Sequence, residues 1–319
     1  MNTSLAKVSV QRAPALIAAA GERASYRFLE FFAAQIRNLH TRRSYIRATA
    51  DFMAWLEGRG MADIRQINSV VIALYVEQLQ ERHPAPTVKQ RLAAIRKLLD
   101  WLATGGVLEF NPATAVRGPR HSVKKGKTPV LAPEEARQLL DSIDVSTPIG
   151  LRDRALIGLM VYSFARIGAA ITMTVEDIYT QNRRLWVRLQ EKGGKQHDMP
   201  CHHNLEEYLV AYLDGCDLRR DPKGPLFRTI GRGTHALTHT PLPQPNAYAM
   251  VARRAAAAGI ATSIGNHTFR ATGITAYLKN GGVLERAATM ANHASTRTTQ
   301  LYDRRSDDIT LDEVERVLI

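Results

Sequence analysis

The segment from His267 to Tyr302 limits most strongly what this chain can fold into, because three short helical patterns follow one another with clear stops. The first, H-T-F-R-A-T-G-I-T-A-Y-L-K-N, places His267 and Arg270 three residues apart and therefore on one helix face. A Gly-Gly pair ends that helix. A second helical pattern ends at His293, and a third element, S-T-R-T-T-Q-L-Y, presents Tyr302.

The distribution of charge favours a polyanionic partner. Lysine and arginine total 43 against 30 acidic residues, which gives a formal net charge of +13. Residues 1–125 hold 19 basic and 9 acidic residues, and the remainder holds 24 and 21, so +10 of the excess lies in the first part. This concentration favours contact with a nucleic-acid backbone, although ribosomal and membrane-surface proteins are also basic.

Other features are typical of an ordinary globular protein with two domains. The chain has 319 residues, and none of its apolar runs approaches the roughly 20 residues that a membrane span needs. The N-terminus lacks the apolar core of a secretory signal. Two cysteines, Cys201 and Cys216, are too few for a disulfide framework. A protein of the reducing cytoplasm is the simplest interpretation.

The first part of the chain predicts a small all-α domain. Amphipathic patterns begin near Ala24, continue through H-T-R-R-S-Y-I-R-A-T-A-D-F-M-A-W-L and recur over residues 69–79. Thr87 is expected to cap a fourth helix, which stops at a Gly-Gly pair. A stretch rich in Pro, Gly and Lys then indicates a linker. The predicted divisions are a tail over 1–21, a helical domain over 22–110, a basic linker over 111–130 and a second domain over 131–319.

Basic side chains are concentrated on these helices and on the linker. In the helix that contains Tyr45 and Phe52, we expect the arginines to lie opposite the apolar stripe. A solvated face is the alternative for each residue, but the charge balance favours contact with DNA phosphates for the set. The candidates are Arg42, Arg43, Arg47, Lys89, Arg91, Arg96, Lys97, Lys124 and Lys125.

The second domain combines an apolar helix with a hairpin. The run G-L-R-D-R-A-L-I-G-L-M-V-Y-S-F-A predicts a buried helix that leads to Arg166. An arginine there is costly to bury without an anionic partner, and the nearest acidic candidates are Asp153 and Glu176. The alternating L-W-V-R-L and a Gly-Gly turn predict a β-hairpin with Lys192 and Lys195 beside the turn.

These motifs together resemble the tyrosine recombinase (phage integrase) family. The H-x-x-R pair at 267 and 270, then His293, then Tyr302 nine residues later match the family's order and spacing. The resemblance spans about residues 22 to 319. It implies a mainly α fold with a small β-sheet or hairpin, in which a helical, SAM-like core-binding domain precedes an α+β catalytic domain.

The resemblance also implies six catalytic positions. They comprise a tyrosine nucleophile, two arginines that bind the scissile phosphate, a histidine that donates to it, a histidine that assists proton transfer and a lysine that protonates the leaving oxygen. In that order they are Tyr302, Arg166 and Arg270, His293, His267 and Lys192, with Lys195 as the alternative lysine. A tyrosyl ester conserves the energy of the phosphodiester, and arginine pairs well with phosphate oxygens. No cofactor is implied, and His202, His203, His235 and His239 lack metal-site spacing.

Two positions depart from the family pattern. Ala169 stands where an acidic residue usually follows the first arginine, and Ala271 stands where many relatives carry histidine. The departure at Ala169 leaves the contact that orients Arg166 unassigned. It also keeps open a catalytically inactive DNA-binding regulator as one alternative function, and a type IB topoisomerase is the other.

The resemblance also implies an assembly on double-stranded DNA. We expect a homotetramer that exchanges strands through a Holliday junction, with or without accessory proteins, and a bacterial, nucleoid-associated location. The absence of an arm-type domain before the helical domain favours a compact enzyme of the resolvase or chromosome-dimer type. Apolar residues recur at helical spacing in the segment 311–319, which is too short to be a stable helix alone. We expect it to dock on a neighbouring subunit.

Overall fold

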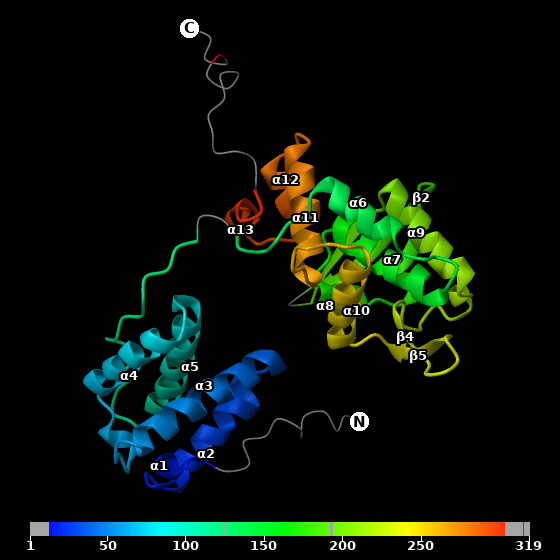
Figure 1. The fold of residues 1–319 in the computed structure, drawn as a ribbon. Coiled ribbons are helices and arrows are strands. Elements are labelled where there is room, and N and C mark those ends of the chain that lie inside the picture. The colour runs from blue at the N-terminus through cyan, green and yellow to red at the C-terminus, as the bar shows by residue number, and fades with distance from the viewer. Residues whose placement is uncertain (1–12, 124–125, 192–193, 304–314, 316–319) are drawn as a thin grey trace. The chain divides into compact units, whose positions relative to one another are not determined.

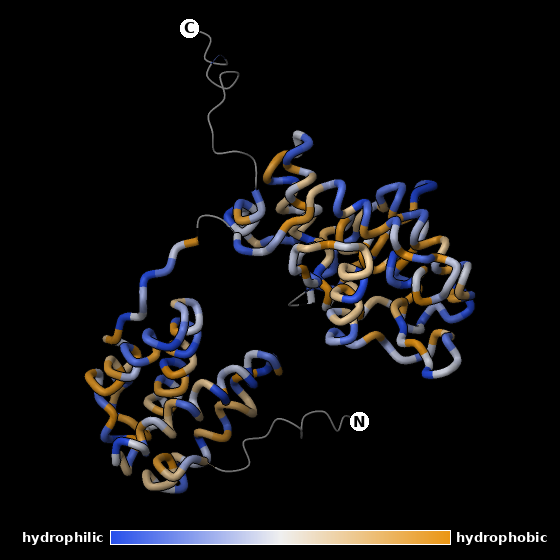
Figure 2. Tube along the Cα trace, in the orientation of Figure 1, coloured by the Kyte–Doolittle hydropathy of each residue, from blue (hydrophilic) through white to orange (hydrophobic). Residues whose placement is uncertain are grey.

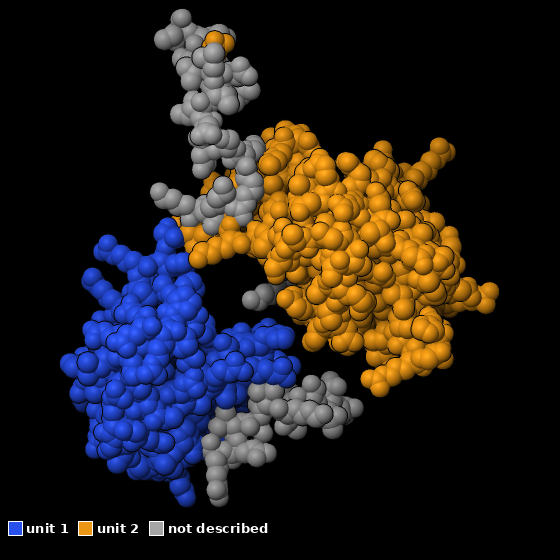
Figure 3. Space-filling model, in the orientation of Figure 1, with its two compact units in different colours: residues 1–122 blue, residues 123–319 orange. Residues whose placement is uncertain are grey.

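The computed structural model describes residues 13–123, 126–191, 194–303 and 315. The chain forms two compact units, residues 1–122 and 123–319 (Figures 1 and 3). The division between them falls inside the predicted linker, 111–130. Within the described ranges, none of the helices has both the length and the apolar character that crossing a membrane requires.

The N-terminal unit is helical, as its amphipathic patterns predict. Figure 2 shows apolar and polar residues interleaved along these helices, and the apolar ones form a single buried cluster that includes Phe28, Phe52 and Leu98. The elements are α1 (Ala15–Ala18), α2 (Glu22–Glu30), a π-helical turn (Phe31–Gln35), α3 (Leu39–Glu57), a 3₁₀ turn (Ile64–Gln66), α4 (Ser69–Arg82) and α5 (Ala85–Thr104).

Side-chain caps fix where two of these helices start. The Asn38 side chain accepts hydrogen bonds from the backbone amides of His40 and Thr41 in the first turn of α3, and Asn68 accepts one from Val71 in α4. The prediction that Thr87 caps the fourth helix is wrong, because α5 already begins at Ala85. Pro86 lies in its first turn, where the missing N–H of proline has no intrahelical acceptor to lose.

Both ends of this unit extend beyond the predicted helical domain. Leu16 and Ile17 of α1 are almost completely buried in the cluster, so part of the segment predicted as a tail contributes to the core. Ala113 and Val116, from the beginning of the predicted linker, are buried in the same cluster.

The C-terminal unit contains helices around two small sheets. Its helices are α6 (Pro133–Asp141), α7 (Pro148–Tyr162), α8 (Ile167–Ile171), α9 (His203–Gly215), α10 (Gln244–Ala257), α11 (Asn266–Lys279), α12 (Leu284–Met290) and α13 (Thr296–Gln300), with 3₁₀ turns at Val175–Asp177 and Leu218–Arg220. Its strands are β1 (Ile178–Gln181), β2 (Arg184–Glu191), β3 (Lys195–Pro200), β4 (Arg228–Ile230) and β5 (Leu237–Pro241).

The predicted hairpin is confirmed as β2 and β3, which pair antiparallel from Trp186 opposite Pro200 to Glu191 opposite Lys195. Gly194 has a φ of 74° at the turn, a conformation that glycine adopts without strain. Strand β1 extends the hairpin to a three-stranded sheet, and β4 pairs with β5 in a second sheet. The sequence did not indicate β1, β4 or β5.

Helix α7 is the centre of this unit, since most of its side chains are buried on all sides. Helix α11, which carries the H-x-x-R pair, packs directly against it. Gly273 makes this approach possible: a Cβ there would overlap the carbonyl oxygen of Val161 and the ring of Phe164. Helices α11 and α12 share a small apolar cluster that includes Phe164 and, after α13, Tyr302.

Candidate active site

Tyr302 lies just after α13 and is 8% exposed. Its backbone carbonyl accepts a hydrogen bond of 2.7 Å from Thr275 Oγ1 on α11, which fixes the chain at this point. Its hydroxyl lies 2.6 Å from Nε2 of His267. The His293 ring stacks on the tyrosine ring, with centroids 5.7 Å apart and an interplanar angle of 13°. The structure therefore brings both histidines to the tyrosine.

Arg270 is the most deeply buried cation of the site, with 1% of its surface exposed. Its Nη1 donates to the Phe164 carbonyl and its Nη2 to the Ala291 carbonyl. Phe164 and Asn292, which follows Ala291, both have positive φ values, 54° and 46°. Such backbone is uncommon outside glycine and recurs at functional sites. Within the described ranges, Nε of Arg270 has no hydrogen-bond partner.

Arg166 comes directly before α8, on the chain that leaves the buried helix α7. Its Nη1 donates to Oε2 of Glu191, the last residue of β2, at 2.5 Å. The Glu191 side chain is only 3% exposed, whereas that of Arg166 is 38% exposed. The predicted partners of Arg166, Asp153 and Glu176, are therefore wrong.

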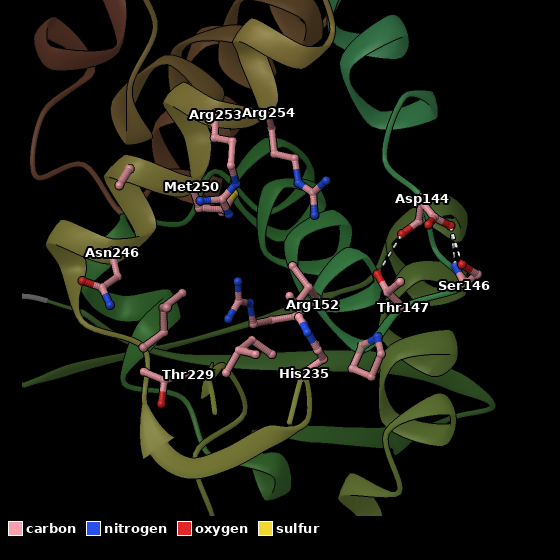
Figure 4. Close-up of a pocket in the computed structure, with 15 residues that line it drawn as sticks. Asp144, Ser146, Thr147, Arg152, Thr229, His235, Asn246, Met250, Arg253 and Arg254 are labelled. Carbon is pink, nitrogen blue, oxygen red and sulfur yellow. Dashed lines mark hydrogen bonds between the residues drawn. The ribbon is translucent and has the colours of Figure 1, made fainter. Parts of the chain in front are cut away.

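Asp153 pairs with other arginines. It lies near the start of α7, whereas Arg166 follows the end of that helix. The rise of nine helical residues separates Asp153 from the end of α7 at Tyr162 by roughly 14 Å. The buried Asp153 carboxylate accepts from Arg152 Nη2 at 2.6 Å and from Arg254 Nε at 2.9 Å. Figure 4 shows these two arginines and Arg253 beside a cavity of about 810 Å³. Glu176 is exposed.

Burial and nearby positive charge lower the pKa of both histidines and of Arg270. Burial, then the charges of Arg270 and Arg166, lower the pKa of His267 below its usual 6.5. The same causes in the same order lower the pKa of His293 to about 4. Burial and Arg166 lower the pKa of Arg270 to about 10, well above neutrality. Near pH 7 the site therefore holds two cationic arginines and two neutral imidazoles.

His293 has a defined orientation. Its Nδ1 lies 2.8 Å from Oγ1 of Thr299, a side chain with no exposed surface on α13. A hydroxyl that donates to Nδ1 leaves the proton of a neutral imidazole on Nε2. His293 can then act as a hydrogen-bond donor at the opposite edge of its ring.

A cavity of about 720 Å³ opens beside these groups. Arg166, Glu191 and His267 line it, together with Ala169 on α8 and the exposed ring of Tyr248 on α10. Glu191, Tyr248 and Thr299 were not predicted from the sequence as parts of the site. The sequence indicates Glu191 in two ways only: an acidic residue lies directly before Lys192, and position 169 holds no acidic residue.

Comparisons with known proteins agree with this arrangement. Residues 129–308 match the phage integrase family, which is more than half of the chain, and residues 27–106 match the N-terminal SAM-like domain of phage integrases. The chain belongs to the phage integrase family. It is a tyrosine recombinase, an enzyme that acts on DNA, and both the predicted family and the predicted mainly α fold are confirmed.

Similar proteins come from several bacteria. The tyrosine recombinase XerD of Corynebacterium glutamicum is 28% identical over 292 residues, which cover 87% of this chain and 90% of XerD. The tyrosine recombinase XerC of Shigella flexneri serotype 5b is 25% identical over 270 residues, which cover 81% of this chain and 83% of XerC.

Two solved structures share the fold. The first is the XerH site-specific recombinase bound to palindromic difH substrate in a post-cleavage complex, with a TM-score of 0.69 and 21% identity over 83% of this chain and 76% of XerH. The second is a lambda integrase tetramer bound to a Holliday junction, with a TM-score of 0.67 and 17% identity over 97% and 84% of the two chains.

Of the recombinase's two candidate lysines, Lys192 lies outside the described residues. Lys195 is exposed at the start of β3. Two residues further along β3, Nε2 of His197 lies 3.0 Å from the carbonyl of Met290. This contact connects the hairpin to α12, the helix that precedes His293.

Among the candidates for DNA contact, Arg42 does not lie opposite the apolar stripe, so that prediction is wrong. It is 5% exposed, and its Nε donates to the Ile36 carbonyl at 2.9 Å. Arg42 therefore holds the start of α3 against the end of the preceding π-helical turn.

The other candidates fall into three groups. Arg91 is paired with Asp51 at 2.6 Å, and Arg96 donates to the carbonyls of Ala113 and Val116. Lys124 and Lys125 lie outside the described residues. The exposed cations are Arg43, Arg47, Lys89 and Lys97.

Proposed function

We propose that this recombinase cleaves and rejoins DNA at a specific site through a 3′-phosphotyrosine at Tyr302, and exchanges strands through a Holliday junction. The observation that carries the proposal is the 2.6 Å contact between the Tyr302 hydroxyl and His267 Nε2. Beside it, Nε of the buried Arg270 has no partner within the described ranges. A buried donor without a partner is costly, and a phosphate oxygen would satisfy it.

His267 accepts the proton of the nucleophile in this proposal. A tyrosine hydroxyl has a pKa of about 10, so it must lose its proton as it attacks. The lowered pKa of His267 keeps the imidazole neutral near pH 7 and leaves Nε2 able to accept. The Tyr302 oxygen then bonds to phosphorus, the bond from phosphorus to the 5′ oxygen breaks, and that oxygen takes a proton from Lys192. Rejoining runs the same steps in reverse.

The two arginines and His293 stabilise the charge that builds on the non-bridging oxygens. Arg166 and Arg270 remain cationic, and each can give a phosphate two donors in fixed geometry. Neutral His293 adds its Nε2 proton when Thr299 occupies Nδ1. Preorganised donors of this kind are typically worth about 3–4 kcal/mol each in the transition state.

The helical unit binds the phosphate backbone of duplex DNA without sequence specificity in this proposal. We assign phosphate contact to the exposed cations Arg43 and Arg47 on α3 and Lys89 and Lys97 on α5. Lys124 and Lys125 join them from the linker in this proposal. Arg42 is excluded because its guanidinium is buried against backbone carbonyls. Arg91 and Arg96 have protein partners and would have to exchange them for phosphate.

We assign the working assembly to a tetramer on two duplexes within the bacterial nucleoid. The support is the shared fold with a lambda integrase that is a tetramer on a Holliday junction. The segment 311–319 is proposed to dock on the neighbouring subunit. All but Glu315 of this segment lies outside the described residues.

A covalent-adduct assay tests the proposal. Duplexes that bind the protein are selected from a random pool, nicked next to the candidate cleavage position, and incubated with wild-type protein or Tyr302→Phe. Denaturing gels should show a protein–DNA band for wild type that is absent for the variant, while gel shifts show equal DNA binding. Tight binding by wild type without a covalent band would instead favour a DNA-binding regulator.

A further inference from the structure

Arg166 is paired with a carboxylate from an element distant in the sequence. The chain around Arg166 offers no acid of its own, since α8 reads I-G-A-A-I. The carboxylate comes instead from Glu191, 25 residues later, at the end of β2. Helix α8 packs on β2, so the two elements hold this ion pair between them.

The two side chains of the pair differ in exposure, as expected when a buried acid orients an arginine. Glu191 is 3% exposed at its side chain and is therefore shielded from solvent behind Arg166. Arg166 is 38% exposed and uses only Nη1 in the pair. Within the described ranges, its Nε and Nη2 make no hydrogen bond, and the side chain lines the same cavity as His267. A carboxylate at one edge of a planar guanidinium leaves the other edge available for phosphate.

Glu191 also acts on the second arginine. The charges of Arg166 and Arg270 oppose each other, which contributes to the lowered pKa of Arg270. The negative charge of Glu191 works in the opposite direction on the same group. A buried acid that faces two cations reduces their mutual repulsion before any phosphate arrives.

We propose that Glu191 is the positioning residue for Arg166, and that it replaces an acid that the chain lacks at position 169. Glu191 does not touch DNA; it holds the guanidinium so that two of its donors face the scissile phosphate. The inference rests on the proposed role of Arg166 in phosphate binding. Ala169 lies three residues after Arg166 and lines the same cavity, so a carboxylate there can reach the arginine.

Moving the carboxylate between the two positions tests the proposal. The variants are Glu191→Ala, Glu191→Gln, and Glu191→Ala combined with Ala169→Glu, with Glu176→Ala as the control that removes an exposed acid. Each is assayed for the single-turnover rate of adduct formation at saturating DNA, for DNA affinity by gel shift and for thermal unfolding.

We expect Glu191→Ala to slow adduct formation about 10- to 100-fold, the usual effect of removing an outer residue that orients a reactive group. Glu191→Gln should also be slower than wild type, because it keeps the shape without the charge. DNA affinity should stay within about twofold of wild type, because Glu191 does not touch DNA. The control should also stay within about twofold, because surface changes are nearly neutral. Restoration of most of the rate by Ala169→Glu in the Glu191→Ala background would show that the carboxylate acts through Arg166.

Two results would overturn the proposal. One is a wild-type rate in Glu191→Ala or Glu191→Gln. The other is an equally slow rate in the single and double variants when both are folded, which would assign Glu191 a merely structural role.

A crystal structure of Glu191→Ala provides a second measurement that needs no cleavage. The Arg166 guanidinium should leave its wild-type position in this variant and return in the double variant. An unmoved Arg166 would also refute the inference. Failure of wild type to form any adduct would count against the proposed function alone.

Discussion

Tyr302 and His267 are close enough to share a proton, so the rate of cleavage should report the protonation of His267. Because burial and the two arginines lower the pKa of His267, the neutral base persists at pH values where an ordinary histidine is already charged. We expect the fall in the single-turnover rate that accompanies protonation of His267 to be centred below pH 6.5. A rate that already drops tenfold between about pH 8 and about pH 7 would contradict this assignment.

His293 should make stability depend on pH. Its pKa is about 4 in the folded protein and near 6.5 in an unfolded chain, so the unfolded state binds more protons between these values. Stability is therefore fully present above 6.5 and declines as pH falls toward 4, by up to about 1.4 kcal/mol per pH unit. Urea unfolding of wild type and His293→Gln, near pH 7 and near pH 5, measures this loss of stability. An equal loss in both proteins would assign the effect to other groups.

The sequence predicted the gathering of Tyr302, His267, Arg270 and His293 through its resemblance to the family, whose order and spacing these residues match. It did not predict the partner of Arg166, for which Asp153 and Glu176 were the candidates. That partner depends on which strand end packs beside α8, and this contact is set by tertiary structure. Local sequence spacing does not reveal a carboxylate whose strand reaches the site from another part of the chain.

Within helix α3, neighbouring arginines have opposite roles. Arg42 donates to the carbonyls of Ile36 and Ala33, whereas Arg43 is exposed. Arg42→Ala leaves both acceptors without a donor, and we expect a loss of about 1–3 kcal/mol in the free energy of unfolding. Arg43→Ala should change stability by less than about 0.5 kcal/mol but weaken DNA binding. Calorimetry and gel shifts on the two variants check this, and the reverse pattern would refute it.

At the scale of elements, strong periodicity was the best guide. Helices α3, α4 and α5 and the β2–β3 hairpin follow apolar patterns that the sequence shows clearly. Strands β4 and β5 were missed because they are short, three and five residues, and each contains a single aliphatic residue, Ile230 and Leu237. The start of α5 was misplaced because two prolines suggested a break, although a proline in the first turn fits a helix.

In the whole molecule, positive charge serves two purposes. The first 125 residues carry an excess of +10, but composition alone does not separate cations that bind DNA from those that hold the fold. Arg42, Arg91 and Arg96 have partners within the N-terminal unit. The number of cations free to contact phosphates is therefore smaller than the number of basic residues in the unit, which limits how many phosphates the unit can contact.

This limit can be measured through the salt dependence of DNA binding. Each phosphate contact on duplex DNA contributes about 0.9 to the slope of the logarithm of affinity against the logarithm of salt concentration. Arg43→Ala with Arg47→Ala should reduce that slope by about 2 and weaken binding to all sequences alike. The matched control is Arg219→Ala with Arg220→Ala, which removes two surface cations already paired with Asp214 and Asp217. If the two double variants lower the slope equally, the N-terminal unit contributes only net charge, and α3 does not contact the phosphates.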